Sequence, residues 1–356
     1  MIAPDHTSAD RVVVRPPNWL GDALLALPAL SAIRRHFPEA RLTIAAPAAI
    51  AALFREETSV RPDAVIDLPA QSRGQLAALA SLRAEVAVLF PNSFRSAWTI
   101  RQAGIPARWG YAGAWRGWLL TRAASRQRTH GVQHQADYYR ALVRGLGIPC
   151  DDSAPSMRAT AASRALAERL FAELNVAAGV RVIAFAPGAA YGQAKQWPPE
   201  RAAAVAARLV AERGATCVIV GAEHDRPAAR AIESWLLAHT PDLAARVVNL
   251  VGRTSVNALA GVLASSDVLV TNDSGAMHLA AALGRPVVAM FGPTDERATR
   301  PIGTHTLVTA DVFCRPCLLR DCPIDHRCMT RISVESVFAA VSRHLAFAQT
   351  AGEGMR

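Results

Sequence analysis

The stretch Val182-Ile-Ala-Phe-Ala-Pro-Gly-Ala-Ala-Tyr-Gly-Gln-Ala-Lys195-Gln-Trp-Pro198 carries the pattern that decides the fold. Its first five residues are apolar and read as a short buried strand. A loop with two glycines follows, and the prolines after Trp197 suit the first turn of a helix. A strand that leads through a glycine-bearing loop into a helix is the repeating unit of α/β proteins.

The same unit recurs along the chain, and it does so in two series separated by a break near residues 148–155. Strands that alternate with helices predict parallel sheets covered by helices on both faces. Helices are expected from about 23 to 36, from 161 to 174 and from 333 to 349. The first series of expected strands is 11–15, 41–45, 64–68, 85–90 and 107–111; the second is 180–186, 216–221, 247–250, 267–271 and 286–291.

Two doubly wound, Rossmann-like domains of the α/β class are therefore predicted. Residues 1–165 form the first and residues 166–332 the second, with parallel sheets that face a cleft. Ligands of such sheets bind beyond the carboxyl ends of the strands, so a substrate is expected between the domains.

Lys195 is the only lysine in the chain, and the other 38 basic residues are arginine. Lysine is a compact point charge on a thin stem, whereas arginine is a flat fork with five donors. A single ammonium in a loop after a strand suggests a phosphate group held in a tight pocket. The alternative is a lysine on the surface that contacts only solvent.

The chain has a net charge of +10 and a pI of about 10.1, which favours an anionic partner. Residues 86–136 contain no acidic residue. Arginine combined with tryptophan suits a lipid headgroup region or a sugar-phosphate acceptor; the alternative is a solvated basic face. The seven arginines of this segment are Arg95, Arg101, Arg108, Arg116, Arg122, Arg126 and Arg128, and its four tryptophans are Trp98, Trp109, Trp115 and Trp118.

Neither a membrane-spanning segment nor a signal peptide is predicted, because the longest apolar run, 23–33, contains Pro28 and ends at two arginines. We therefore expect a cytoplasmic protein.

The strongest motif is Thr271-Asn-Asp-Ser-Gly-Ala-Met-His278, at the end of an expected strand and the start of a helix. Free N–H groups at the helix start attract an anion, and Gly275 allows it to come close, while Ser274 adds a hydroxyl. Asp273 either caps the helix, holds sugar hydroxyls or faces a cation. His278 lies one turn further on, where it either reaches the same pocket or packs within the helix layer.

A second motif, Pro16-Pro-Asn-Trp-Leu-Gly-Asp22, follows the first strand. The Asp22 carboxylate is a candidate general base that removes a proton from an acceptor hydroxyl. The alternative is a helix N-cap, and a helix start would also keep the carboxyl pKa low.

In Gly221-Ala-Glu-His-Asp225, the acid Glu223 either holds ribose hydroxyls or is solvated.

Four cysteines gather in Cys314-x2-Cys317-x4-Cys322-x5-Cys328, with His326 among them. In a cytoplasmic protein this spacing indicates a metal site, and zinc is the candidate ion. Reduced thiols in a structural loop and a redox-labile pair are the alternatives.

These residues resemble glycosyltransferase family 9, the lipopolysaccharide heptosyltransferases. The resemblance covers nearly the whole chain. Within the family, residues 17–22, 89–95 and 103–110 are similar to the type II branch. The motifs that carry the family resemblance are Asn272–His278, Gly284-Arg-Pro286, Phe291-Gly-Pro-Thr294 and the loop from Pro187 to Pro198.

The resemblance implies a GT-B architecture, with the acceptor on the first domain and the nucleotide sugar on the second. The C-terminal helix, within residues 333–356, would pack back on the first domain. The donor would be ADP-L-glycero-D-manno-heptose, and the acceptor the first heptose of the inner core on Kdo-lipid A. Transfer would invert the anomeric centre. The protein would be cytoplasmic and peripherally associated with the cytoplasmic face of the inner membrane. No cofactor is required by the resemblance, although Mg²⁺ is compatible with it.

The resemblance also assigns roles to individual residues. Asp22 would be the base, Lys195 the diphosphate contact and Glu223 a ribose or adenosine contact. The sugar-diphosphate would be held by Asp273, Ser274 and Gly275, with His278 nearby. On the acceptor side we place Asn18, Asn92 and Arg95.

Other functions would share part of this pattern. A type I or type III heptosyltransferase, or another GT-B sugar-nucleotide enzyme such as an epimerase, would share the fold and most of the motifs. A basic nucleic-acid-binding module would explain the pI. However, the arginines form no nucleic-acid motif and the tryptophans are not spaced as stacking platforms, so no nucleic-acid partner is expected.

Overall fold

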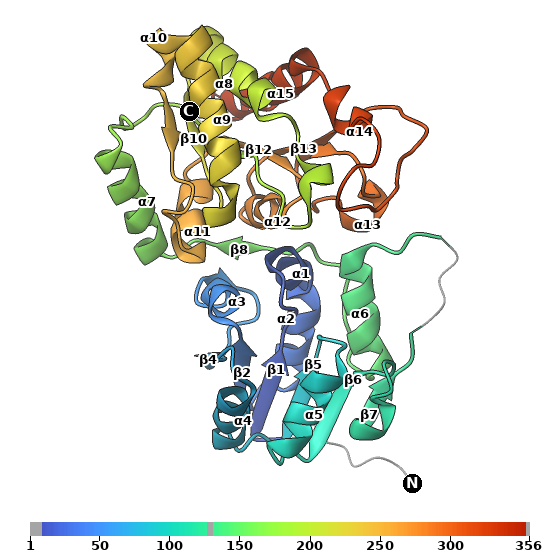
Figure 1. Cartoon of the computed structure of the whole chain (residues 1–356). Helices are drawn as coiled ribbons and strands as arrows, with labels where there is room; N and C mark the ends of the chain where they lie inside the picture. Colours follow the sequence, from blue (N-terminus) through green and yellow to red (C-terminus); the bar gives the residue numbers. More distant parts are fainter. Residues whose placement is uncertain (1–8, 127–130, 354–356) are drawn as a thin grey trace. The chain divides into compact units, whose positions relative to one another are not determined.

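The computed structural model describes residues 9–126 and 131–353, with side chains up to residue 346. The chain divides into two compact units, Met1–Met157 and Arg158–Arg356. Each unit contains a six-stranded, wholly parallel sheet (Figure 1). The predicted class, two doubly wound α/β domains, is confirmed.

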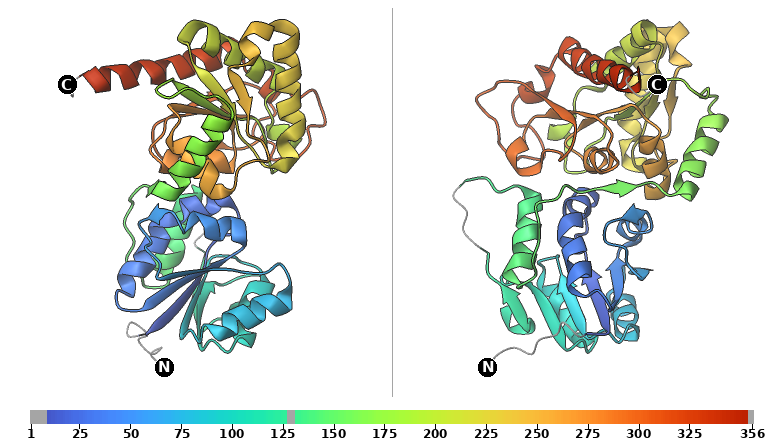
Figure 2. Two further views of the ribbon diagram at one scale, coloured as in Figure 1. Left: turned by 90° about the vertical axis from the view of Figure 1, so that its left-hand side faces the viewer. Right: turned by 180° about the vertical axis from the view of Figure 1, so that it is seen from behind.

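The first sheet has the strand order β4-β2-β1-β5-β6-β7. Helices α2 and α6 pack together, and so do α4 and α5, on opposite faces of the sheet (Figure 2). The strands are β1 Arg11–Arg15, β2 Arg41–Ala46, β4 Ala64–Asp67, β5 Val86–Leu89, β6 Ala107–Tyr111 and β7 Arg122–Ala124. The helices are α1 Leu20–Leu25, α2 Leu27–His36, α3 Ala48–Leu53, α4 Ser72–Ser81, α5 Phe94–Gln102, the short η2 Gly117–Leu119 and α6 Gln135–Gly145. The short strands β3 Glu57–Thr58 and β8 Met157–Arg158 pair separately.

The second sheet has the order β11-β10-β9-β12-β13-β14. Its strands are β9 Val182–Ala186, β10 Thr216–Ile219, β11 Val247–Asn249, β12 Val268–Asn272, β13 Val287–Phe291 and β14 His305–Thr309. Its helices are α7 Ala161–Glu173, η3 Gln193–Lys195, α8 Pro199–Arg213, η4 Glu223–Asp225, α9 Arg226–His239, α10 Pro241–Ala244, α11 Val256–Ala264, α12 Gly275–Ala282, α13 Glu296–Thr299, α14 Arg327–Thr330 and α15 Val334–Glu353.

Both sheets run outward from their first strand in two directions. In each, the strand order reverses beside that strand, between β1 and β5 in the first sheet and between β9 and β12 in the second. In such sheets the ligand binds beyond the carboxyl ends of the strands at this reversal. The loops that follow these four strands are therefore where a site is to be sought.

Three details of the secondary structure differ from the sequence-based expectation. Strands β7 and β14 were not predicted, because both lie at a sheet edge and their sequences are short or partly exposed. The single helix expected over 23–36 is instead two helices that meet at Ala26. Pro28 lacks an N–H group, so it starts the second helix and cannot continue the first.

The basic segment is less exposed than its composition suggests. Trp109 is 1% exposed and belongs to the core, and Arg116 is fully buried. The Arg116 guanidinium donates to the carbonyl oxygen of Tyr111 at 3.1 Å and to that of Pro91. Burial lowers its pKa to about 10, which still leaves it charged at neutral pH. These two residues are therefore not part of a solvated face.

The C-terminal helix α15 packs on the second unit. It contacts α8, and the buried side chains of Val337, Phe338, Val341 and Leu345 belong to the same core as α8 and β9. These four residues form one apolar stripe at helical spacing, and the second sheet supplies the apolar surface that covers it.

The boundary between the units lies at Met157, eight residues earlier than predicted. Helix α7 packs closely on α11, so it belongs wholly to the second unit. Gly261 permits this approach: an added Cβ there would overlap the Ser163 carbonyl and lie 3.1 Å from the Ala167 Cβ.

Gly261→Ala is expected to destabilise the second unit by at least about 2 kcal/mol, because the new methyl group forces α7 and α11 apart. The midpoint of thermal unfolding should fall by about 4 °C or more. Gly117→Ala is the matched control, since nothing lies within 4 Å of its added Cβ. An unchanged midpoint for the Gly261 variant would contradict the proposed tight contact.

No helix in the described part of the chain is long and apolar enough to span a lipid bilayer.

Candidate functional site

Lys195 and Asp273 meet at the reversal point of the second sheet. Lys195 closes the 3-10 turn η3 after β9, and Asp273 follows β12 directly. The Lys195 Nζ donates to Asp273 Oδ2 at 2.6 Å, and the two side chains are 12% and 7% exposed. Thr294 Oγ1 donates to the same oxygen at 2.9 Å, and the Tyr191 ring centre lies 4.6 Å from Nζ. The lone ammonium is thus held by a nearly buried carboxylate.

Asn272 fixes the two loops relative to each other. Its Nδ2 donates to the carbonyl oxygens of Pro187 at 2.7 Å and Gly188 at 3.2 Å. Its Oδ1 accepts from the Trp197 N–H at 3.1 Å. Because this buried amide bonds both ends of the loop that carries Lys195, the ammonium has a defined position before any ligand arrives.

The start of helix α12 lies beside this pair. Ser274 is its N-cap, with Gly275 as the first helical residue. Asp273 precedes the cap and its carboxylate points to Lys195, so the capping alternative for Asp273 is excluded in favour of a cation partner. The Ser274 Oγ lies 2.9 Å from Thr271 Oγ1, and His278 is buried one turn into the helix. The motif therefore presents a helix start, a hydroxyl and an ion pair together.

Glu223 lies apart from this group, at the end of the segment after β10. Its side chain is 71% exposed and pairs with Arg226, which holds the pKa of the Glu223 carboxyl below its usual range. Gly252, at φ +76°, leaves room for the carboxylate. The position is open to a ligand, and no contact joins Glu223 to Lys195 or Asp273 among the interactions of the described residues.

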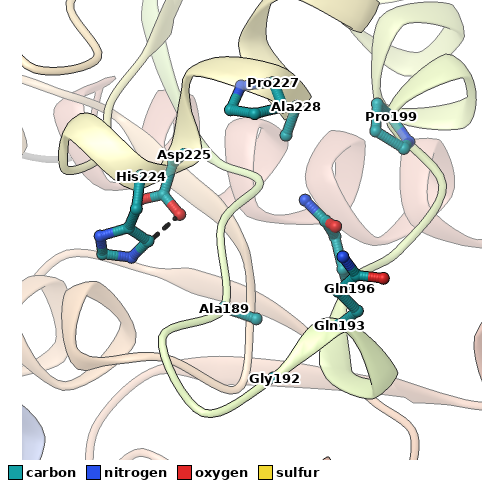
Figure 3. Close-up of a pocket in the computed structure, with 9 residues that line it drawn as sticks. All are labelled: Ala189, Gly192, Gln193, Gln196, Pro199, His224, Asp225, Pro227 and Ala228. Atoms are coloured by element: carbon teal, nitrogen blue, oxygen red, sulfur yellow. Dashed lines mark ion pairs between the residues drawn. The ribbon is translucent and has the colours of Figure 1, made fainter. Parts of the chain in front are cut away.

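A pocket of about 380 Å³ is lined by residues of the Lys195 loop and by residues of η4 and α9 (Figure 3). In it His224 Nε2 and Asp225 Oδ1 are 3.3 Å apart. The nine lining residues include neither Lys195 nor Asp273, so the candidate site rests on the ion pair and not on this pocket. Its lining is Ala189, Gly192, Gln193, Gln196, Pro199, His224, Asp225, Pro227 and Ala228.

The cysteine-rich segment supports the Lys195 loop. The Ala194 N–H donates to the Arg320 carbonyl at 2.9 Å, and His326 Nε2 lies 2.7 Å from the Ala194 carbonyl oxygen. At Gly192 a side chain would meet the Arg320 backbone, whose Cα would lie 2.9 Å from the added Cβ. The segment thus holds Ala194, the residue before Lys195. The spacing of the four cysteines alone did not suggest this role.

The thiols of this segment are free, and burial raises the pKa of the Cys328 thiol. Cys328 is buried, Cys317 is exposed, and Cys314 and Cys322 are intermediate. Among the residues that the structure describes, no three Cys, His, Asp or Glu side chains are grouped as a metal site would require.

In the first unit, Asp22 lies at the reversal point between β1 and β5. It is the third residue of α1, whose N-cap is Trp19, so the capping alternative is excluded. The Asp22 carboxylate is hydrogen-bonded to the Tyr139 hydroxyl, and Gln135 Nε2 donates to that hydroxyl at 3.0 Å. Burial, followed by the charge of Asp22, raises the pKa of Tyr139, which therefore stays protonated as a donor.

The residues expected on the acceptor side differ in their surroundings. Asn18 and Arg95 are exposed. Asn92 is half-buried: its Nδ2 donates to the Tyr138 hydroxyl at 2.6 Å, and its Oδ1 accepts from Arg116 at 3.3 Å. Asn92 follows β5 and is held by α6, the same helix that holds Asp22 through Tyr139.

Tyr139→Phe is expected to lower kcat by about 10-fold, since a hydrogen bond to a charged group is lost. That bond favours the ionised carboxylate, so its loss raises the pKa of Asp22. The acid limb of the kcat/KM profile should therefore move to higher pH. Tyr111→Phe is the control, because its hydroxyl donates to the Tyr138 carbonyl at 2.8 Å. Identical pH profiles for the Tyr139 variant and the parent would remove Tyr139 from this role.

Sequence reasoning missed Tyr139, Gln135 and Arg320, and it named Thr294 only as part of a motif. No local pattern distinguishes these residues, because each acts through a partner on a distant segment. The two adjacent tyrosines at 138–139 after the acid-free segment were the one available signal.

With this geometry established, comparison with known proteins gives the family. The model described as "Glycosyltransferase family 9 (heptosyltransferase)" matches residues 76–327. The chain belongs to this family. It is a glycosyltransferase, and its two doubly wound units are those of the GT-B fold.

Several relatives cover most of the chain. Lipooligosaccharide heptosyltransferase 2 of Haemophilus influenzae is 28% identical over 309 residues, which cover 83% of this chain and 87% of the relative. Lipopolysaccharide heptosyltransferase 2 of Escherichia coli is 29% identical over 82% of this chain and 85% of the relative. The structure described as E. coli ADP-heptose LPS heptosyltransferase II has a TM-score of 0.81 at 25% identity, covering 95% and 99% of the two chains.

Proposed function

We propose that this glycosyltransferase transfers L-glycero-D-manno-heptose from ADP-heptose to the first heptose of heptosyl-Kdo-lipid A, with inversion at the anomeric carbon. The observation that carries the proposal is the Lys195–Asp273 pair beside the α12 start, at the reversal point of the second sheet. The names of the relatives that cover most of the chain support the choice of a type II heptosyltransferase.

Lys195 is the proposed contact of the donor diphosphate. The transition state of glycosyl transfer resembles an oxocarbenium ion, so negative charge grows on the departing ADP. A positive charge that is already in place stabilises this leaving group without reorganisation. Lys195 is in place because Asp273 and the Asn272-fixed loop hold it.

Asp273 has two proposed tasks. It orients the ammonium in the absence of donor, and it accepts hydrogen bonds from sugar hydroxyls when the donor is bound. A carboxylate is repelled by a diphosphate, so we place the phosphates toward Lys195 and the N–H groups of Ser274 and Gly275. His278 lies one turn behind them, and Glu223 is the proposed ribose or adenosine contact.

Asp22 is the proposed general base, which takes the proton of the attacking acceptor hydroxyl. The Tyr139 hydroxyl keeps the Asp22 carboxylate oriented. Asn18, Asn92 and Arg95 are the proposed acceptor contacts, with Arg95 available for an anionic group of the glycolipid.

The proposal requires no metal, because Lys195 supplies the positive charge; turnover in EDTA that matches turnover in Mg²⁺ would agree with this.

The direct test is transfer from ADP-heptose to purified heptosyl-Kdo-lipid A, with Kdo-lipid A as the control acceptor. Transfer to the heptosylated acceptor alone is the expected result. Transfer only to Kdo-lipid A would replace type II with type I specificity. Thermal stabilisation by ADP, with none from UDP or NAD, is expected to accompany it; equal stabilisation by UDP would refute the proposed donor.

A further inference from the structure

The first unit has an exposed aromatic surface that the proposed reaction does not use. Phe94, Trp98, Trp115 and Trp118 are 42%, 38%, 93% and 61% exposed. Large apolar side chains that are exposed together indicate an interaction surface. Together with Arg101 they are called here the aromatic–arginine surface.

Three of the rings form one contiguous patch. The ring centres of Phe94, Trp98 and Trp118 lie 6.1 to 6.3 Å from one another. The Arg101 guanidinium carbon lies 5.3 Å from the Trp118 ring centre, so a cation is placed directly on the patch. Phe94, Trp98 and Arg101 come from α5, whereas Trp118 comes from η2.

Buried hydrogen bonds fix the backbone that carries these exposed rings, so the rings do not belong to a loose loop. Arg116, fully buried, donates to the Pro91 and Tyr111 carbonyls and lies 3.3 Å from Ser96 Oγ. Arg108 Nε donates to the Leu119 carbonyl at 2.6 Å. These bonds tie both sides of Trp118 to the body of the unit, which keeps the indole at the surface.

The charge around the patch selects an anionic partner. Between Asp67 and Asp137 the only acidic residue is Glu85, and it pairs with Arg11 at 3.2 Å. Arg95, Arg101 and Arg126 are exposed in the same interval. Arginine near an anionic membrane surface strengthens binding through its charge.

Ring geometry favours a bilayer over a nucleic acid. Phe94 and Trp98 stack on each other at 15°, and Arg101 lies over Trp118, so one face of each of these rings is already covered. Bases need free ring faces for stacking. Indole side chains flanked by arginine instead suit the headgroup level of a membrane.

We propose that the aromatic–arginine surface docks this protein on an anionic phospholipid bilayer. Arg116 connects the surface to the acceptor side, because it bonds Asn92 while it anchors the segment that carries Trp118. Docking there would bring the acceptor residues to a glycolipid that stands in the bilayer. The inference goes beyond heptosyl transfer, and its test needs neither ADP-heptose nor the acceptor.

Co-sedimentation with vesicles of phosphatidylcholine containing phosphatidylglycerol tests this on the full chain. The parent should bind these vesicles and bind phosphatidylcholine alone weakly. Trp98→Ser/Trp118→Ser is expected to weaken binding by about 10-fold or more, and Arg101→Glu by about 5-fold, with a shallower salt dependence. Leu237→Ser is the matched control, since Leu237 is 64% exposed on α9 of the second unit. All variants should keep the parent's unfolding midpoint.

Binding of the double variant at the parent's level would overturn the proposal. Equal binding to both kinds of vesicle would overturn its electrostatic part. Self-association in the absence of lipid that the double variant abolishes would show that the surface is instead covered by a second copy. In each of these cases transfer to detergent-solubilised acceptor would stay intact, so the proposed function would stand.

Discussion

Lys195→Met is expected to lower kcat for heptosyl transfer by about 10²- to 10³-fold, the usual loss when one electrostatic contact to the developing charge is removed. The effect should appear in kcat as well as in KM, because the charge on the leaving diphosphate grows toward the transition state. Lys195→Arg is expected to be poor too. The 12% exposed site between Asp273 and Tyr191 is shaped around a point charge, and a planar fork does not fit it.

The Lys195→Met variant also leaves the Asp273 carboxylate, 7% exposed, without its ammonium. An unpaired buried charge costs about 3 to 5 kcal/mol, so lost activity has to be distinguished from lost folding. Lys195→Met/Asp273→Asn removes both charges and should regain the parent's unfolding midpoint while remaining inactive. Arg297→Met, which removes an exposed guanidinium that pairs with Asp295, is the control for loss of a cation. Turnover like that of the parent in the single variant would take Lys195 out of the mechanism.

Asp22→Asn is expected to lower kcat by about 10²- to 10⁴-fold, the range for loss of a general base. The amide keeps the shape of the carboxylate and still accepts from the Tyr139 hydroxyl, so the first unit should remain folded. Binding of ADP, measured by calorimetry, should be unchanged, because the proposed nucleotide contacts lie in the second unit.

The control for Asp22→Asn is Asp151→Asn, which removes an exposed carboxylate paired with Arg35 at 3.0 Å in the same unit. It should transfer heptose at the parent's rate. Full transfer by the Asp22 variant would mean that another group removes the proton. Loss of ADP binding together with transfer would instead show that Asp22 acts through the donor site.

Most of the fold could be predicted, because its signals are local. Short apolar strands, glycine-bearing loops and helical stripes recur in order, and they predicted both sheets apart from β7 and β14. Those two edge strands lack the buried apolar run that marks a central strand. The helix break at Ala26 also has a local cause, which is Pro28. The sequence showed this proline, but the break was not predicted from it.

The site could be predicted only in part. Chemistry-bearing residues that directly follow a strand, such as Asp22, Lys195 and Asp273, were identified because strand ends are where α/β sheets bind ligands. Their partners were not. Tyr139 lies on a helix that no sequence spacing connects to Asp22, and Thr294 reaches Asp273 from the loop after a different strand.

By itself, then, the sequence determined the α/β class, the family and the presence of one lysine in a strand-end loop. Tertiary structure alone decided that this lysine faces Asp273, 78 residues away, and that Arg116 and Trp109 are buried while Trp118 is exposed. The reason is the crossover connection: parallel strands that are neighbours in the sheet are far apart in the chain. Side chains at their carboxyl ends therefore meet only once the sheet has formed.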